Sequence, residues 1–155
     1  MPQEKDEVTQ GKRAGLLLAS SCFACGPDNP RGLHLAFQAN EGGEMIAEWI
    51  PEPEMEGYEG IVHGGLVSTV LDEAMAKVVD ASGAAALTAE LRVRFRQQVP
   101  SGSPSRVRGW IANRSKRMIN TEAVLTGVGG VELARAWAVF LALKPERSPN
   151  AEKEL

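Results

Sequence analysis

Two adjacent glycines stand where the long amphipathic pattern of the sequence begins. Gly64 and Gly65 follow His63, and the apolar residues of an expected helix come directly after them. The first N–H groups of a helix have no intrahelical partner and carry roughly half a positive charge. Glycines leave these groups unobstructed, so the position suits binding of an anion or stabilisation of an oxyanion. The alternative is that the glycines only begin a buried helix.

Asp72 is a carboxylate on the same expected helix. At about 100° per residue it lies at the edge of the apolar arc, with Ser68 and Ala76 one turn before and after it. These small neighbours would let a substrate or a second helix approach the carboxylate closely. Glu73, about 100° further round the helix, is the competing carboxylate. An exposed aspartate with no chemical role is the simpler alternative.

The separation of the glycines from Asp72 limits how they could act together. Gly65 and Asp72 are seven residues apart, which is roughly 10.5 Å along a helix. An oxyanion donor must lie about 3 Å from the developing charge, and a base acting through one water must lie close to the same carbon. One helix can hardly serve both roles for one carbonyl group. We therefore expect each site to combine Gly65 of one subunit with Asp72 of a facing subunit.

One strong helix is expected to carry these residues. It begins at Gly64 or Gly65 and ends near Asp80, with Gly83 as a stop signal. Its apolar positions fit a period of 3.6 residues and are Leu66, Val67, Val70, Leu71, Ala74, Met75, Val78 and Val79.

Alternating apolar residues predict strands before and after this helix. Two short strands are expected at residues 33–37 and 45–50, and longer ones at residues 91–95, 107–112, 118–128 and 131–143. One helix cannot cover both faces of a sheet of five or six strands, so we expect the sheet to curve around the helix. The rest of the sheet, or its edge, would then be open to a partner subunit.

Length and composition fit one globular domain. The chain has 155 residues, of which 43% are hydrophobic, and 17 basic against 20 acidic residues give a net charge of −3. This slight acidity argues against nucleic acid as the main partner, and no apolar run is long enough to predict a membrane span. We place the domain at residues 14–144, between polar, disordered tails at residues 1–13 and 145–155. The apolar stretch after Lys12-Arg13 is too short for a signal peptide, which favours a cytoplasmic location.

Cys22 and Cys25 form a Cys-x-x-Cys pair in a loop rich in glycine and proline. Zinc needs four ligands, and the chain otherwise offers only His34 and His63 as nitrogen donors. A four-cysteine site shared across a dimer is one alternative, and a redox role lacks the surrounding strand–helix–strand pattern. We favour reduced thiols in a structural turn and expect no metal.

The sequence around the glycines and Asp72 resembles one enzyme family. Residues 62–65 (Val-His-Gly-Gly), followed by residues 71–74 (Leu-Asp-Glu-Ala), resemble the hotdog-fold acyl-CoA thioesterases of the PaaI-like group, named after the phenylacetate pathway. Residues 22–33, 88–95 and 132–140 resemble the N-terminal signature, the strand after the helix and the last strand of that group. The resemblance covers roughly residues 20 to 143, which is most of the chain.

The resemblance implies a hotdog fold, an α+β architecture in which an antiparallel sheet of five to six strands wraps around one long central helix. It also implies hydrolysis of an acyl-CoA thioester by a homodimer or a dimer of dimers, with no metal or organic cofactor. The N–H of Gly65, with Gly64 beside it, would polarise the thioester carbonyl, and Asp72 of the facing subunit would act as general base or nucleophile. Thr88 matches a position that helps to place the water, and His63 would shape the turn before the helix.

Further residues are expected near the substrate. Ser68 and Glu73 lie on the helix beside Asp72. Phosphates of coenzyme A would need arginine or lysine near a pocket mouth. We take Arg94, Arg114 and Arg117 as candidates, although solvated strand and turn residues are the alternative, and the sequence offers Arg92, Arg96 and Lys116 as well.

Two other functions compete with hydrolysis. A hotdog hydratase or dehydratase pairs a histidine with a helix carboxylate, and this chain has His63 and Glu73. A non-catalytic acyl-CoA-binding protein is the second alternative, and the presence of both Asp72 and Thr88 argues against it. Gly57 is a departure from the family pattern, because some relatives carry asparagine or glutamine near this position to contact the substrate.

Overall fold

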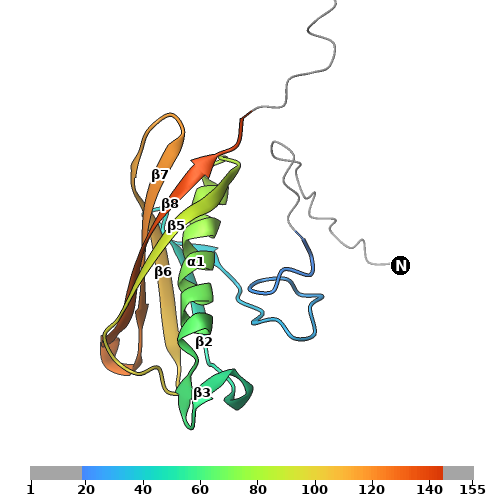
Figure 1. Ribbon diagram of the computed structural model, residues 1–155, viewed down its shortest axis with the longest axis vertical. Helices are drawn as coiled ribbons and strands as arrows, with labels where there is room; N and C mark the ends of the chain where they lie inside the picture. Colours follow the sequence, from blue (N-terminus) through green and yellow to red (C-terminus); the bar gives the residue numbers. More distant parts are fainter. Residues whose placement is uncertain (1–18, 145–155) are drawn as a thin grey trace, which may run out of the picture.

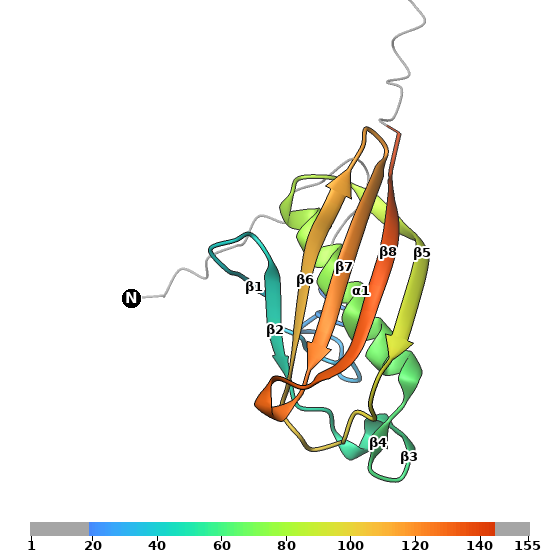
Figure 2. The same ribbon diagram turned by 90° about the vertical axis from the view of Figure 1, so that its left-hand side faces the viewer.

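The computed structural model describes residues 19–144, in which one helix lies against a six-stranded antiparallel sheet (Figure 1). The elements in chain order are β1 (Gln38–Ala39), β2 (Met45–Trp49), the 3-10 turn η1 (Pro53–Met55), β3 (Glu56–Tyr58), β4 (Ile61–Val62), α1 (Gly64–Ala81), β5 (Ala86–Phe95), β6 (Ser105–Arg114), β7 (Met118–Thr126), the 3-10 turn η2 (Val128–Gly130) and β8 (Glu132–Ala142). The strand order is β1-β2-β6-β7-β8-β5, so β5 forms one edge of the sheet (Figure 2). The hotdog fold predicted from the sequence is confirmed, whereas the tails predicted at residues 1–13 and 145–155 lie outside the described residues.

The apolar face of α1 packs directly on the middle of the sheet. Val70, Leu71 and Met75 are completely buried there. The closest approach is at Gly109 of β6, where an added Cβ would lie 2.6 Å from the carbonyl oxygen of Ala74. Glycine is therefore the residue that lets the helix backbone rest on the strand. Among the described residues, no helix has both the length and the apolar character needed to cross a membrane.

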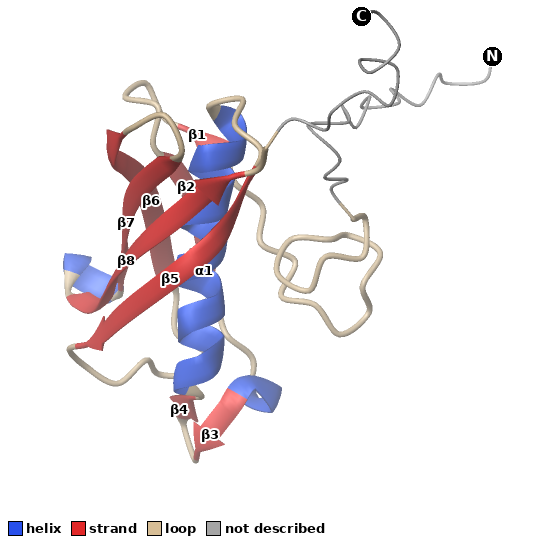
Figure 3. Cartoon of the chain, turned by 45° about the horizontal axis from the view of Figure 1, so that its top comes forward, coloured by secondary structure: helices blue, strands red, loops and turns tan. Residues whose placement is uncertain are grey.

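The segment before β1 differs from the sequence-based prediction. Residues 33–37 are not a strand, although Leu33 and Leu35 are buried and His34 between them is exposed, as the alternation suggested. The N–H groups of Leu33 and Leu35 donate instead to the carbonyl oxygens of Phe23 and Ala24, at 2.8 and 2.9 Å. His34 has a φ of +51°, which breaks the extended backbone. This loop covers the side of α1 that faces away from the sheet (Figures 1 and 3).

The remaining predicted elements are present with shifted ends. The helix is one residue longer than predicted and is followed by Gly83, whose φ of +88° stops it. The two longest predicted strands become β7 and β8, joined by a turn in which the N–H of Gly127 donates to the carbonyl of Val131. The largest shift is in β5, which begins at Ala86 rather than at Leu91.

Candidate functional site

The start of α1 is built by His63 and the two glycines. His63 is the N-cap, and its Nδ1 accepts a hydrogen bond of 2.9 Å from the N–H of Gly65. The carbonyl of His63 accepts from the N–H groups of Leu66 and Val67. Among the described residues, the N–H of Gly64 is the first-turn donor for which no hydrogen bond is found. Gly64 is therefore the donor that is available to a substrate oxygen without rearrangement.

A hollow of about 350 Å³ lies beside this helix start. Gly64, Val67 and Phe95 are among the residues that line it. The ring of Phe95 covers Gly64 so closely that an added Cβ would lie 3.3 Å from its Cζ. Sequence reasoning did not single out Phe95, because this contact depends on where β5 crosses the helix. The hollow thus lies next to Gly64, whose N–H has no hydrogen bond to any described residue, and has apolar side chains in its wall.

Asp72 lies on the side of α1 that faces β5. Its Oδ1 accepts a hydrogen bond of 2.9 Å from Oγ1 of Thr88. Burial raises the pKa of the half-buried Asp72 carboxyl above its ordinary value, and the Thr88 hydrogen bond partly opposes this by stabilising the charged form. Asp72 and Thr88, which were predicted separately as site residues, are thus brought together from two elements.

A bulge in β5 turns Thr88 toward the helix. Thr88 pairs with the buried Phe140 of β8, but the register shifts before Glu90, which pairs with Val139. Before the bulge the even-numbered Thr88 faces the helix, and beyond it the odd-numbered Phe95 does. The bulge therefore changes which residues of the strand face the helix. Arg92 points to the opposite face, where it stacks on Trp137 at 4.6 Å from the ring centroid. An extra residue in the edge strand therefore aims the hydroxyl at Asp72, a use that bulges commonly have at functional sites.

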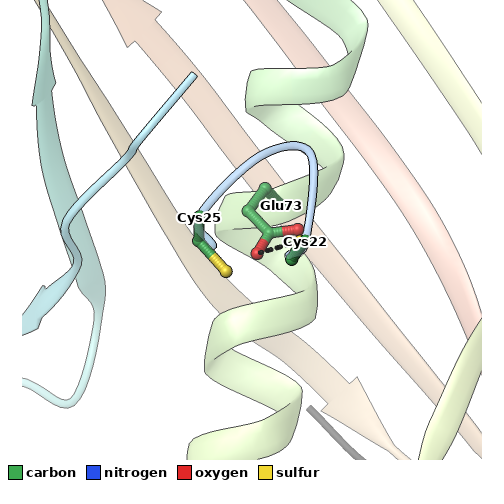
Figure 4. A group of neighbouring side chains, drawn as sticks. All are labelled: Cys22, Cys25 and Glu73. Carbon is green, nitrogen blue, oxygen red and sulfur yellow. Dashed lines mark hydrogen bonds between the residues drawn. The ribbon is translucent and has the colours of Figure 1, made fainter. Parts of the chain in front are cut away.

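Glu73 faces away from Asp72, toward the N-terminal loop. Its Oε1 lies 4.0 Å from Sγ of Cys22 and 3.9 Å from Nζ of Lys77 (Figure 4). Burial, together with the hydrogen bond and the charge of Glu73, raises the pKa of Cys25 to about 12, so this thiol is protonated near neutral pH. The two neighbouring carboxylates, predicted as competitors, thus lie in different environments.

The other predicted substrate residues are spread over the molecule. Ser68 donates from Oγ to the carbonyl of Gly64 at 2.9 Å, which keeps its side chain against the helix. Arg114 lies at the far end of α1, where Nη1 is 3.4 Å from Oγ of Ser82. Arg117 is also near that end of the sheet, because its carbonyl accepts from Ala142 at the end of β8. Arg94 lies on β5 toward the start of α1, so the three arginines do not form one cluster within the chain.

Comparison with known proteins agrees with this arrangement. Residues 59–134, which contain α1 and Thr88, match the model of the family described as the thioesterase superfamily. The chain is similar to this superfamily over these 76 of its 155 residues. It is 25% identical to acyl-coenzyme A thioesterase THEM4 of Bos taurus over 116 residues, which make up 74% of this chain and 48% of that protein. The chain thus spans about half the length of this curated relative.

Two solved structures share the fold of this chain. The BH2602 protein from Bacillus halodurans, determined with CoA, has a TM-score of 0.65 and 25% identity, covering 74% of this chain and 77% of that chain. The PaaI protein of E. coli has a TM-score of 0.66 and 15% identity, covering 70% of this chain and 83% of that chain. The resemblance to the PaaI-like group predicted from the sequence is confirmed for the fold, which the PaaI structure shares. The family match begins at residue 59, so it does not include the loop that carries Cys22 and Cys25.

Proposed function

We propose that this protein hydrolyses acyl-CoA thioesters to the free acid and CoA. The observation that carries the proposal is the half-buried Asp72 carboxylate, held by Thr88 between the central helix and the sheet edge. The match to the thioesterase superfamily model supports the reaction class, and the acyl-CoA thioesterase name of the bovine relative and the CoA in the Bacillus structure support the substrate. Both cysteines are free, which supports a cytoplasmic location.

In the proposed reaction, the N–H of Gly64 donates to the thioester oxygen and stabilises the negative charge that develops there. Asp72 takes a proton from a water molecule, whose oxygen attacks the carbonyl carbon. The C–S bond then breaks, and the departing CoA sulfur takes up the proton that Asp72 received, so CoA leaves as the thiol and Asp72 is a carboxylate again. Direct attack by the carboxylate, followed by hydrolysis of the resulting anhydride, gives the same products. Gly65 can join Gly64 as a donor when its N–H leaves Nδ1 of His63.

We propose that the active form is a homodimer joined through β5, alone or as half of a dimer of dimers. This ten-residue edge strand exposes 53% of Leu87 and 53% of Phe95, and Leu91 between them is also exposed. A long edge with apolar side chains is a template for pairing with another strand. Two copies that pair antiparallel across a two-fold axis bring the start of each β5 beside the end of the other.

This pairing would complete the site from two subunits. Within one chain β5 contacts α1 at two separate points, where Thr88 meets Asp72 and Phe95 meets Gly64. Antiparallel pairing of β5 therefore places Asp72 of one subunit near the partner's Gly64. The separation of roughly 10 Å along one helix is then no obstacle, because the donor and the base come from different helices.

Hydrolysis is tested by measuring release of the CoA thiol from short, medium, long and aromatic acyl-CoAs. We expect release above background with at least one substrate, and loss of that release in Asp72→Asn. Folded protein that binds acyl-CoA without releasing thiol would support the non-catalytic alternative and overturn the proposal. A hydratase would need His63 and Glu73 to face one substrate, whereas Nδ1 of His63 accepts from Gly65 and Glu73 faces Cys22.

The shared site is tested by mixing two inactive variants. Gly64→Pro removes the donor and Asp72→Asn removes the base, so a mixed dimer has one intact and one doubly defective site. After subunit exchange, we expect the mixture to recover about a quarter of wild-type activity, since half of the dimers are mixed. Mixed dimers detected by native mass spectrometry that show no activity would contradict the shared site.

A further inference from the structure

Three side chains that can ligate metal converge beside α1, on the opposite side of the helix from the sheet. The Sγ atoms of Cys22 and Cys25 and a carboxylate oxygen of Glu73 all lie within 4.8 Å of one another. Figure 4 shows the loop curving over the helix so that both cysteines approach Glu73. All three residues are half-buried, and neither cysteine is in a disulfide. The thioester hydrolysis proposed above uses Asp72 and Gly64 and does not require any residue of this group.

The loop that presents the cysteines is fixed by its own backbone. The N–H of Gly26 donates to the carbonyl of Cys22 at 2.8 Å, and an added Cβ at Gly26 would lie 2.3 Å from the N of Cys22. Between the cysteines, the carbonyls of Phe23 and Ala24 accept from the segment before β1, and Ala24 is 4% exposed. Both thiols are therefore held in place by a tight turn anchored in the core, as a preorganised ligand pair requires.

The three ligand atoms, all within 4.8 Å of one another, lie within about 1 Å of the spacing in a tetrahedral zinc site. Zn–S bonds of about 2.3 Å and Zn–O bonds of about 2.1 Å place two sulfurs about 3.8 Å apart and a sulfur and an oxygen about 3.6 Å apart. The 4.0 Å between Sγ of Cys22 and Oε1 of Glu73 needs only a small side-chain movement to reach this value. Thiolates select soft or borderline ions such as Zn²⁺ over Mg²⁺ and Ca²⁺.

We propose that Cys22, Cys25 and Glu73 bind a thiophilic divalent metal ion such as Zn²⁺, which fastens the N-terminal loop to α1. Two S–H bonds break and two metal–sulfur bonds form, and the two protons go to solvent. Water, or a ligand from outside the three, occupies the fourth position. Lys77, whose Nζ is 3.9 Å from Glu73, makes the site neutral when it holds a divalent ion, two thiolates and the carboxylate. From the sequence we expected reduced thiols in a structural turn, because Glu73 was not recognised there as a third ligand.

The test uses the reduced full chain after treatment with a chelator. Zinc is added in competition with a chromophoric chelator, and Co²⁺ is added separately as a spectroscopic probe. We expect one tightly bound ion per chain, a sulfur-to-cobalt charge-transfer band and a higher Tm with zinc. Glu73→Gln should weaken zinc binding by at least about tenfold, and Cys22→Ser or Cys25→Ser should abolish the charge-transfer band. Glu44→Gln, which removes a carboxylate paired with Arg108 instead, is the matched control and should bind as the wild type does.

Several outcomes would overturn the metal site. These are the absence of stoichiometric binding by the reduced wild-type chain, binding that survives the double Cys22→Ser, Cys25→Ser change, and equal binding by the oxidised and reduced chains. A circular dichroism melting curve of each variant shows that it is folded. None of these measurements uses acyl-CoA, so the result is independent of the proposed hydrolysis.

Discussion

The side of α1 that packs on β6 and the side that faces β5 differ in how completely they are filled. On the β6 side the helix backbone touches Gly109, and Leu71 and Met75 have no exposed surface. On the β5 side a half-buried carboxylate with a raised pKa lies beside an edge strand whose apolar side chains are exposed. The closed side fixes the position of the helix, and the open side leaves room for a substrate and a second subunit. The reactive groups thus lie on the side of α1 that the single chain leaves less buried.

Removing the carboxylate on the open side should have the largest effect. Asp72→Asn is expected to lower kcat/KM for acyl-CoA by about 10³-fold, because the base is lost while the side chain keeps its shape. Loss of activity in Glu73→Gln together with retention in Asp72→Asn would instead favour the hydratase alternative.

The same substitution should not destabilise the fold. Burial raises the pKa of Asp72, so the stabilisation linked to its protonated form is present at low pH and is lost as the pH rises through the raised value. At neutral pH the neutral amide avoids this cost, and we expect the Tm of Asp72→Asn to equal or exceed that of the wild type. A clear fall in Tm would show that Asp72 has a structural role instead.

Removing the donor at the helix start comes next. Gly64→Pro should lower kcat by roughly 10²- to 10³-fold, the usual effect of losing one oxyanion donor. Proline suits the first helical position, and His63 before it has a ψ of 130°, which a residue before proline tolerates. Gly64→Ala is the matched control, since it adds a Cβ against Phe95 but keeps the N–H. Equal loss in both variants would mean that crowding, and not the donor, matters.

The packing of α1 on β6 can be disrupted without changing the β5 side of the helix. Gly109→Ala should lower the free energy of unfolding by about 3 kcal/mol, because the new Cβ would meet the backbone of Ala74, which cannot move aside easily. Gly42→Ala is the control, since a Cβ there would lie an ordinary 3.5 Å from the nearest atom. Denaturant unfolding measures both. Equal stability of the two variants would refute tight packing at Gly109.

The smallest predicted effect on activity concerns Thr88. Its hydrogen bond lowers the pKa of Asp72, so Thr88→Val should raise that pKa further and move the acidic limb of the pH–kcat/KM profile to higher pH. We expect a loss of about three- to tenfold near neutral pH, and Thr88→Ser should restore the profile. If the acidic limb of the pH–kcat/KM profile is the same in Thr88→Val as in the wild type, Thr88 does not influence the ionisation of Asp72.

Helical periodicity was enough to predict α1 within a residue, because its apolar face is continuous from Leu66 to Val79. Strand periodicity was less reliable. Alternation alone missed residues 86–90 of β5, since the bulge breaks it, although the family resemblance already placed residues 88–95 in this strand. Alternation also gave a strand at residues 33–37, where the loop hydrogen-bonds to residues 23 and 24. Asp72 and Thr88 were both predicted, and their contact follows from packing of β5 against the helix.

Other parts of the site depend on tertiary packing that no spacing rule supplies. Glu73 approaches Cys22 and Cys25 because a loop far away in sequence folds over α1. Likewise, nothing in the order of residues indicates that Phe95 covers Gly64. The oligomeric state and the individual site roles remain predictions.

The bulge in β5 also bears on how the family could vary. Thr88 and Phe95 face α1 together only because one extra residue lies between them, so the number of residues in this strand matters separately from their identity. Inserting or deleting a residue between them would turn one of the two away from the helix. Evolution can therefore exchange side chains along this strand far more freely than it can change the strand's length.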